Sequence, residues 1–205
     1  MDPLELIHMQ IGLEYRLDES GLLEPCPGST EHALYLVYEY SLGYVPFYGS
    51  ELPATARQKI ITLGPKSSFD DPESTRDLIE SAGQGCKCGY DKFWSGYIKN
   101  PPKPEDYPQA TRMGGHWVIL RDGDVICQAC SVRQDERCAE VYVESLPAFR
   151  RQGYGRQVVA AWACDVMNSG RVAFYSYKIG NNASAALARS LGVEWYANVA
   201  GFEEK

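Results

Sequence analysis

The spacing of apolar and polar positions predicts an alternation of helices and strands along the chain. Leu4, Ile7 and Ile11 recur at helical spacing and predict an N-terminal amphipathic helix. The aromatic run at 33–40 is β-prone, and a short turn separates it from a similar run at 44–48, so the two are expected to form a hairpin. Two more helices are expected, one that follows Pro53 and ends at Gly64-Pro65 and one over 74–81.

A proline-rich stretch at 100–108 interrupts this pattern and predicts an extended connector, because proline cannot propagate a helix or a central strand. The connector suggests two parts, residues 1–110 and residues 111–205. An antiparallel meander followed by crossovers in the second part indicates an α/β (α+β) fold. The expected order there is strands at 116–120, 125–132 and 138–144, a helix at 153–168, a strand at 172–177, a helix at 184–191 and a strand at 194–200.

Composition and charge argue against several classes of protein. Hydrophobic residues make up 44% and charged residues 23%, which is typical of a globular protein. The formal net charge of −7 argues against a nucleic-acid partner, which normally requires a basic surplus. No apolar run approaches the ~20 residues of a membrane span. The acidity is uneven, because residues 1–110 hold 17 acidic and 9 basic side chains, whereas residues 111–205 hold 10 and 11.

The N-terminal residues and the cysteines bear on the compartment and on metal binding. Residues 1–5 lack the basic segment of a secretory signal, and seven cysteines are an odd number for a disulfide framework. We therefore expect reduced thiols in a cytoplasmic protein. A zinc site could be imagined with four cysteine ligands, Cys86, Cys88, Cys127 and Cys130. However, the last two lie three residues apart on an expected strand and face opposite sides, so no metal site is expected.

The strongest local feature is the loop Arg150–Arg156, which lies between an expected strand and an expected helix. Gly153 and Gly155 allow a tight turn and a close approach of the backbone to a ligand. The start of the helix presents unpaired N–H groups and the positive end of the helix dipole, and such a place binds an anion, most readily a phosphate or pyrophosphate. The alternative is a plain strand-to-helix turn with surface arginines.

Two segments in this part resemble motifs of one superfamily. Residues 144–155 (ESLPAFRRQGYG) resemble motif A of the GNAT superfamily of acetyl-CoA-dependent N-acetyltransferases, whose core Gln/Arg-x-x-Gly-x-Gly/Ala is matched by Arg150, Gly153 and Gly155. Residues 181–192 resemble its Asn-x-x-Ser/Ala segment, which ends in Leu-Gly. A narrower resemblance, over roughly residues 118–201, is to a bacterial branch with a variable N-terminal half.

The resemblance implies a GNAT-like fold and a different role for each of the two parts. The fold would be a mixed, mostly antiparallel central sheet flanked by helices. Residues 111–205 would form the acetyl-CoA-binding core, and residues 1–110 would contribute helices and a hairpin on the acceptor side.

The resemblance also implies where acetyl-CoA is held. The strand at 138–144 would splay from its neighbour and leave backbone groups around Val143 and Ser145 for the pantetheine arm. Asn181 would bond near the pantetheine, with Ser184 as the N-cap of its helix. The backbone N–H groups from 152 to 156 would hold the pyrophosphate. The residues expected to contact the cofactor are Val143, Ser145, Arg150, Arg151, Gln152, Gly153, Tyr154, Gly155, Arg156, Asn181 and Ser184.

Acyl transfer to an amine needs a base for the ammonium proton and a donor for the developing oxyanion. Strand alternation places Glu140 and Glu144 on one face, and Glu140 stands where the resemblance implies the general base. Glu144 and a water-mediated or substrate-driven deprotonation are the alternatives. The tyrosine that many members use as the acid is replaced here by Ala188. Three tyrosines on neighbouring elements are open substitutes: Tyr175, Tyr177 and Tyr196.

The sequence thus predicts an N-acetyltransferase that moves the acetyl group from acetyl-CoA to a primary amine by direct attack. The acceptor is expected to be a small-molecule amine or an amine of a peptide or protein, with neither nucleic acid nor a membrane as a partner. The oligomeric state is left open and includes a homodimer. The alternative function is a non-catalytic acyl-CoA-binding sensor or interaction module with the same fold, which the missing tyrosine at Ala188 favours.

Overall fold

The computed structural model describes residues 1–27, 32–83 and 87–204 of the chain. The chain forms two compact units, Met1–Ser95 with Tyr196–Lys205 and Gly96–Trp195, which we call unit 1 and unit 2. The chain thus divides at 95/96 and again at 195/196, whereas the sequence suggested one division after residue 110. Unit 1 takes up the C-terminal residues because they pair with one of its strands.

Unit 1 contains four helices and a sheet with the strand order β4-β3-β11-β5 among its described residues. A separate two-stranded sheet is formed by β1 and β2. The strands β5 and β11 run through both units. The elements are α1 (Pro3–Ile11), β1 (Tyr15–Leu17), β2 (Leu23–Pro25), β3 (Ala33–Tyr40), β4 (Gly43–Tyr48), α2 (Ala54–Leu63), α3 (Pro65–Asp70), α4 (Pro72–Ala82), β5 (Cys88–Ile98) and β11 (Val193–Glu204).

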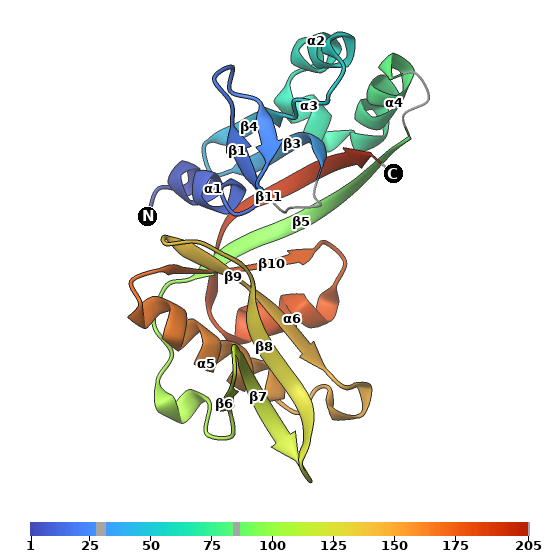
Figure 1. The fold of residues 1–205 in the computed structure, drawn as a ribbon. Coiled ribbons are helices and arrows are strands. Elements are labelled where there is room, and N and C mark those ends of the chain that lie inside the picture. The colour runs from blue at the N-terminus through green and yellow to red at the C-terminus, as the bar shows by residue number, and fades with distance from the viewer. Residues whose placement is uncertain (28–31, 84–86, 205) are drawn as a thin grey trace. The chain divides into compact units, whose positions relative to one another are not determined.

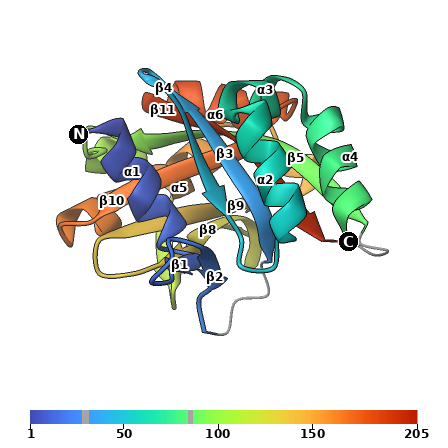
Figure 2. The same ribbon diagram turned by 90° about the horizontal axis from the view of Figure 1, so that it is seen from above.

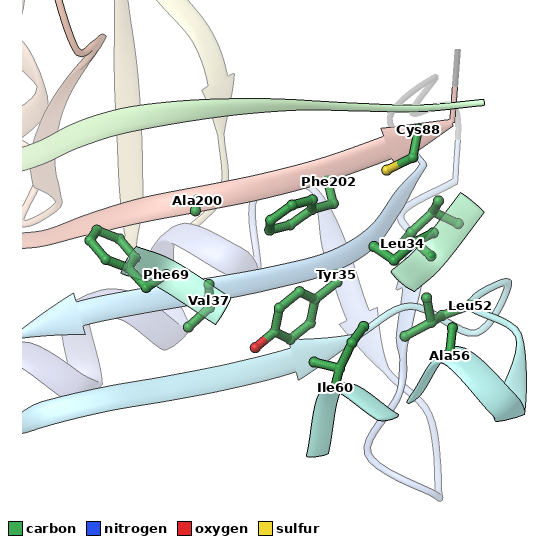
Figure 3. Packing of buried hydrophobic residues seen from close by; sticks show 11 residues of the cluster. Leu34, Tyr35, Val37, Leu52, Ala56, Ile60, Phe69, Cys88, Ala200 and Phe202 are labelled. Atoms are coloured by element: carbon green, nitrogen blue, oxygen red, sulfur yellow. The ribbon is translucent and has the colours of Figure 1, made fainter. Parts of the chain in front are cut away.

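The core of unit 1 is built around β3, whose first six residues are all buried. This strand is bordered on both sides, by β4 and by β11, and both pairings are antiparallel. Tyr35 stacks on Phe202, with ring centroids 5.6 Å apart (Figure 3). It also stacks on Tyr48 of β4, with ring centroids 5.3 Å apart. The helix α3 packs against β3 and β4, and α2 packs against α3 and α4 (Figure 2).

The sequence predicted the hairpin and the helices α1, α2 and α4, and it missed the short strands β1 and β2 as well as α3 and β5. Gly64-Pro65 ends α2 as expected. However, Gly64 has a φ of 85°, and Pro65 starts the new helix α3, since proline is tolerated in the first turn of a helix. In β5 the half-buried stretch at 90–94 gives no alternation of apolar and polar residues that would have predicted a strand.

Unit 2 is a mixed sheet with two helices packed on it. The strand order is β10-β9-β8-β7-β6, in which only β9 and β10 are parallel among the described residues. The helix α5 contacts β7, β8, β9 and β10, and α6 contacts α5 and β10 (Figure 1). The elements are β6 (Thr111–Met113), β7 (His116–Arg121), β8 (Asp124–Gln134), β9 (Cys138–Ser145), α5 (Tyr154–Asn168), β10 (Val172–Lys178) and α6 (Asn182–Ser190), with short 3-10 helices at Pro104–Asp106 and Pro147–Phe149.

The predicted fold class is confirmed, because both units combine a mostly antiparallel sheet with flanking helices. The expected strands and helices of the second part are present with small changes at their ends. In addition, no helix in the described ranges has the length and apolar character needed to cross a membrane.

The proline-rich connector is a packed element of unit 2 and not simply an extended one. It contains a 3-10 turn at Pro104–Asp106. Asp106 forms an ion pair with Arg156 of α5 at 2.9 Å, and the Tyr107 ring lies 6.0 Å from that of Trp117. The connector is therefore held against α5 and β7, a result that its proline content alone did not predict.

Candidate active site

The parallel strands β9 and β10 separate within unit 2. They pair at only three positions, from Val172–Cys138 to Phe174–Glu140. All residues of both strands are described, and no residue of β9 after Glu140 pairs with a residue of β10. The side of β9 that faces β10 therefore presents the backbone of residues 141–145 to a ligand, which can pair with it as an added strand would. Val143 and Ser145, two of the predicted cofactor contacts, lie in this segment.

The two faces of β9 have different surroundings. The α5 face is identified by Trp162, whose indole Nε1 donates to Ser131 Oγ of β8 at 3.0 Å. Ser131 stands opposite Val141, so Val141, Val143 and Ser145 share the α5 face. The predicted carboxylates Glu140 and Glu144 lie on the opposite face.

Glu140 is the only charged side chain that is buried among the described residues, at 4% exposure. Its Oε2 lies 3.2 Å from Arg133 Nη1 of β8, and its Oε1 accepts a hydrogen bond from Ser176 Oγ of β10. Buried carboxylates are rare unless they are paired, and this one has a partner on each oxygen. Ser176 was not predicted, because a contact between two strands 36 residues apart in sequence leaves no local signal.

Glu144 has a more open environment. Its side chain is exposed, and its Oε2 accepts from Gln128 Nε2 at 3.4 Å across the β8–β9 pair. Both predicted carboxylates thus lie on one face of β9, one buried and the other open to solvent.

The loop between β9 and α5 is held by its own polar contacts. Arg150 Nε donates to the Ser145 carbonyl at 3.1 Å, and Gln152 Nε2 donates to the Ala148 carbonyl at 3.2 Å. Arg151 and Gly153 have left-handed φ values of 61° and 81°. Because Gly153 is the N-cap and α5 has no side-chain cap, the first N–H groups of this helix are available to an anion.

Side chains at the start of α5 make structural contacts with neighbouring elements. Besides its ion pair with Asp106, Arg156 donates through Nε to the Ser190 carbonyl at the end of α6, at 3.2 Å. A Cβ added to Gly155 would lie 3.5 Å from Leu187 of α6 and 4.0 Å from Ser145 Oγ, which is ordinary van der Waals contact. Tyr154 is half-buried as the first residue of the helix.

The N-cap of α6 is Asn181 and not Ser184, which corrects the prediction. Asn181 Oδ1 accepts from the backbone N–H of Ser184 at 3.1 Å. The helix therefore starts at Asn182, and Ser184 lies in its first turn. Asparagine is among the preferred N-caps, and the side chain nearest the start of the helix satisfies its free donor.

The tyrosines named as open substitutes for the acid lie in different places. Ala188 is buried in α6 and offers no hydroxyl. Tyr175 is buried, its hydroxyl donates to the Ser184 carbonyl at 3.4 Å, and burial raises its pKa. Tyr177 stands on the same face of β10, with its ring centroid 6.4 Å from that of Tyr175. Tyr196 belongs to unit 1, where its hydroxyl donates to Gln10 of α1.

Within residues 1–27, 32–83 and 87–204, no group of three or more histidine, cysteine or acidic side chains is arranged so that it could hold a metal ion. Cys127 is buried beside Ser145, with Sγ and Oγ 3.0 Å apart, and burial raises the pKa of its thiol. Cys130 lies on the other face of β8, as strand alternation predicted. Cys86 lies outside the described residues.

Comparison with known proteins identifies the family. The sequence profile of the GNAT acetyltransferases matches residues 94–199, which is more than half of the chain. The chain therefore belongs to the GNAT acetyltransferase family, and the protein is an acyltransferase.

Two solved structures support the fold. One is a putative acetyltransferase of the GNAT family from Novosphingobium aromaticivorans, with a TM-score of 0.52, 16% identity and coverage of 60% of this chain and 69% of that chain. The other is a GNAT-family acetyltransferase from Colwellia psychrerythraea, with a TM-score of 0.52, 10% identity and coverage of 78% and 76%. A search of the curated proteins found no significant match.

Proposed function

We propose that the protein transfers the acetyl group of acetyl-CoA to a primary amine by direct attack of the amine on the thioester. The observation that carries this proposal is the separation of β9 and β10 just before the loop that leads to the uncapped start of α5. An extended arm that ends in a pyrophosphate matches this sequence of sites, with an open strand edge followed by a helix N-terminus.

The cofactor would lie along β9. Its pyrophosphate would accept hydrogen bonds from the backbone N–H groups of residues 152–156, with Arg150 and Arg151 adding positive charge. Its pantetheine arm would pair with the backbone around Val143 and Ser145. From Ser145 back to Glu140 the strand spans about 17 Å, at about 3.3 Å per residue. The acetyl group would then arrive near the point where the two strands separate.

The acceptor would approach on the face of β9 that carries the two glutamates. A protonated amine cannot attack, so a base must remove one proton before or during the attack. Glu140 is the proposed base because it lies at the point of separation. Glu144 is the alternative, since it is exposed on the same face. The negative charge of this pair would favour a cationic amine.

Acetyl-CoA binding is tested by comparing Gly153→Ala with Gly170→Ala. These glycines lie just before and just after α5, with φ values of 81° and 82°, and in both cases an added Cβ would meet nothing within 4 Å. The two variants should therefore lose similar stability from backbone strain, at about 1–2 kcal/mol. Only Gly153→Ala should also weaken acetyl-CoA in isothermal titration, by roughly tenfold, which corresponds to about 1.4 kcal/mol. Equal affinities in the two variants would remove the loop from the site.

A further inference from the structure

A three-residue cluster surrounds the carboxylate at the point where β9 and β10 separate. Glu140 is the last β9 residue paired with β10, and Ser176 lies two residues beyond its partner Phe174 on the same face of β10. The hydrogen bond from Ser176 to Glu140 therefore spans the opening between the two strands. Glu140 is buried, whereas Ser176 is only half-buried, so Ser176 stands on the accessible side of the pair.

A β-bulge in β8 places Arg133 on this face. The β8–β9 register shifts between Ser131 and Arg133, so that Ser131 pairs with Val141 and Arg133 pairs with Glu140. Without the extra residue Val132, alternation from Ser131 would turn position 133 toward α5. The bulge thus places the guanidinium against Glu140 Oε2 and leaves Oε1 to Ser176.

Other side chains also lie around Glu140 on this face of the sheet. Cys138 lies on the same face of β9, and burial together with nearby Asp135 raises the pKa of its thiol to about 12, so it stays neutral. Tyr142 follows on β9 as an exposed side chain, and Phe174 is the buried neighbour on β10. From β8, the Arg133 guanidinium faces the carboxylate.

The direction of the Ser176–Glu140 hydrogen bond follows from chemistry. Ser176 Oγ donates to Glu140 Oε1, and a carboxylate that acts as a base only accepts hydrogen bonds. The lone pairs of Ser176 Oγ then remain for a donor outside the pair. A protonated or neutral amine presents N–H donors and suits this oxygen, and the adjacent carboxylate makes the site favourable for a cation.

We propose that Ser176 relays the proton between the acceptor ammonium and the buried Glu140 carboxylate. This inference rests on the proposed amine acetylation. In the step, an N–H bond of the ammonium breaks and its proton binds Ser176 Oγ, while the original hydroxyl proton moves to Glu140 Oε1. The amine keeps its electron pair for attack on the thioester carbonyl. The serine is unchanged after the step, and Glu140 returns its proton to solvent by the reverse path.

Glu140 is buried, whereas Ser176 is half-buried, so an amine reaches the serine hydroxyl before it reaches the carboxylate. In the relay, the carboxylate keeps Arg133 on Oε2 throughout. Arg133 is then a positioning residue that fixes the orientation of Glu140, and Ser176 is the residue that touches the substrate.

The test compares Ser176→Ala with Ser176→Thr and with the matched control Ser131→Ala. Ser131 is a half-buried, hydrogen-bonded serine on β8 of the same unit, but on the α5 face. Thiol release from acetyl-CoA is followed with a panel of putrescine, tyramine, lysine and a peptide with a free N-terminus. We expect Ser176→Ala to lower kcat by roughly 10²-fold or more, Ser176→Thr to restore most of it, and Ser131→Ala to keep it. The affinity for acetyl-CoA and the melting temperature of the Ser176 variants should equal those of the unaltered protein.

The solvent isotope effect on the unaltered protein provides a second test, with Ser176→Ala as its comparison. Two protons move together in a relay, so the single-turnover rate should depend on the fraction of D₂O in a curved manner, and the residual rate of Ser176→Ala should depend on it linearly. A kcat of Ser176→Ala close to that of the unaltered protein, or a linear dependence in the unaltered protein, would overturn the relay while leaving the acetyltransferase in place. No turnover of any amine by the unaltered protein would instead overturn the proposed function, and the relay with it.

Discussion

At the scale of single residues, the environment of Glu140 combines charge, burial and position. Its carboxylate is buried, is paired on both oxygens, and lies where two parallel strands separate. Strand alternation in the sequence was enough to place Glu140 and Glu144 on one face. It could not reveal Arg133 or Ser176, because the first depends on a bulge and the second on a parallel strand reached through α5.

Asp135 provides a residue-scale prediction on pH. Loss of hydration opposes its charge, but hydrogen bonds from the backbone N–H groups of Arg137 and Cys138 and from the Cys138 thiol outweigh this and lower its pKa. A lowered pKa in the folded state adds stability above the unfolded value of 3.8, and this stability is lost as the pH falls through the folded value. Asp135→Asn should therefore be less stable than the unaltered protein at pH 7, with the difference shrinking below pH ~3.8.

Urea unfolding at pH 7 and at pH 3 measures this difference. Asp124→Asn, at the exposed start of β8, is the matched control and should show no such change. A stability difference for Asp135→Asn that is the same at both pH values would contradict the assignment.

At the scale of elements, the sequence predicted unit 2 well because its strands alternate and its helices have clear starts and stops. The loop before α5 and the helix α6 both appear where the motifs placed them. The elements that the sequence did not predict also have a physical explanation. The strand β5 shows no alternation of apolar and polar residues that would distinguish it from a loop. Gly64-Pro65 ends the helix α2 and also starts the helix α3.

The cap of α6 provides an element-scale prediction. Asn181 satisfies the Ser184 N–H at the start of the helix, whereas the adjacent Asn182 is the first helical residue and is not the cap. Asn181→Ala should lower the free energy of unfolding by about 1 kcal/mol, and Asn182→Ala should leave it nearly unchanged. Urea unfolding compares them, and an equal loss in both variants would show that the cap does not stabilise the helix.

At the scale of the whole molecule, contacts between residues far apart in sequence decide how the chain divides. The C-terminal strand β11 pairs with β3, and Asn198 Nδ2 donates to Glu39 Oε2 at 2.8 Å across 159 residues of sequence. No local pattern encodes such a pairing, so the sequence predicts a boundary at the proline-rich connector instead. The proposal that residues 1–110 form the acceptor side stays a prediction.

Acetylation of a primary amine by the intact chain with acetyl-CoA can be measured directly. The most direct measurement incubates the intact protein with acetyl-CoA and the amine panel and follows the products by mass spectrometry, with thiol release measured in parallel. The account predicts an acetylated amine whose formation matches the release of the CoA thiol and is lost in Glu140→Gln. Binding of acetyl-CoA without an acetylated product from any amine would contradict it.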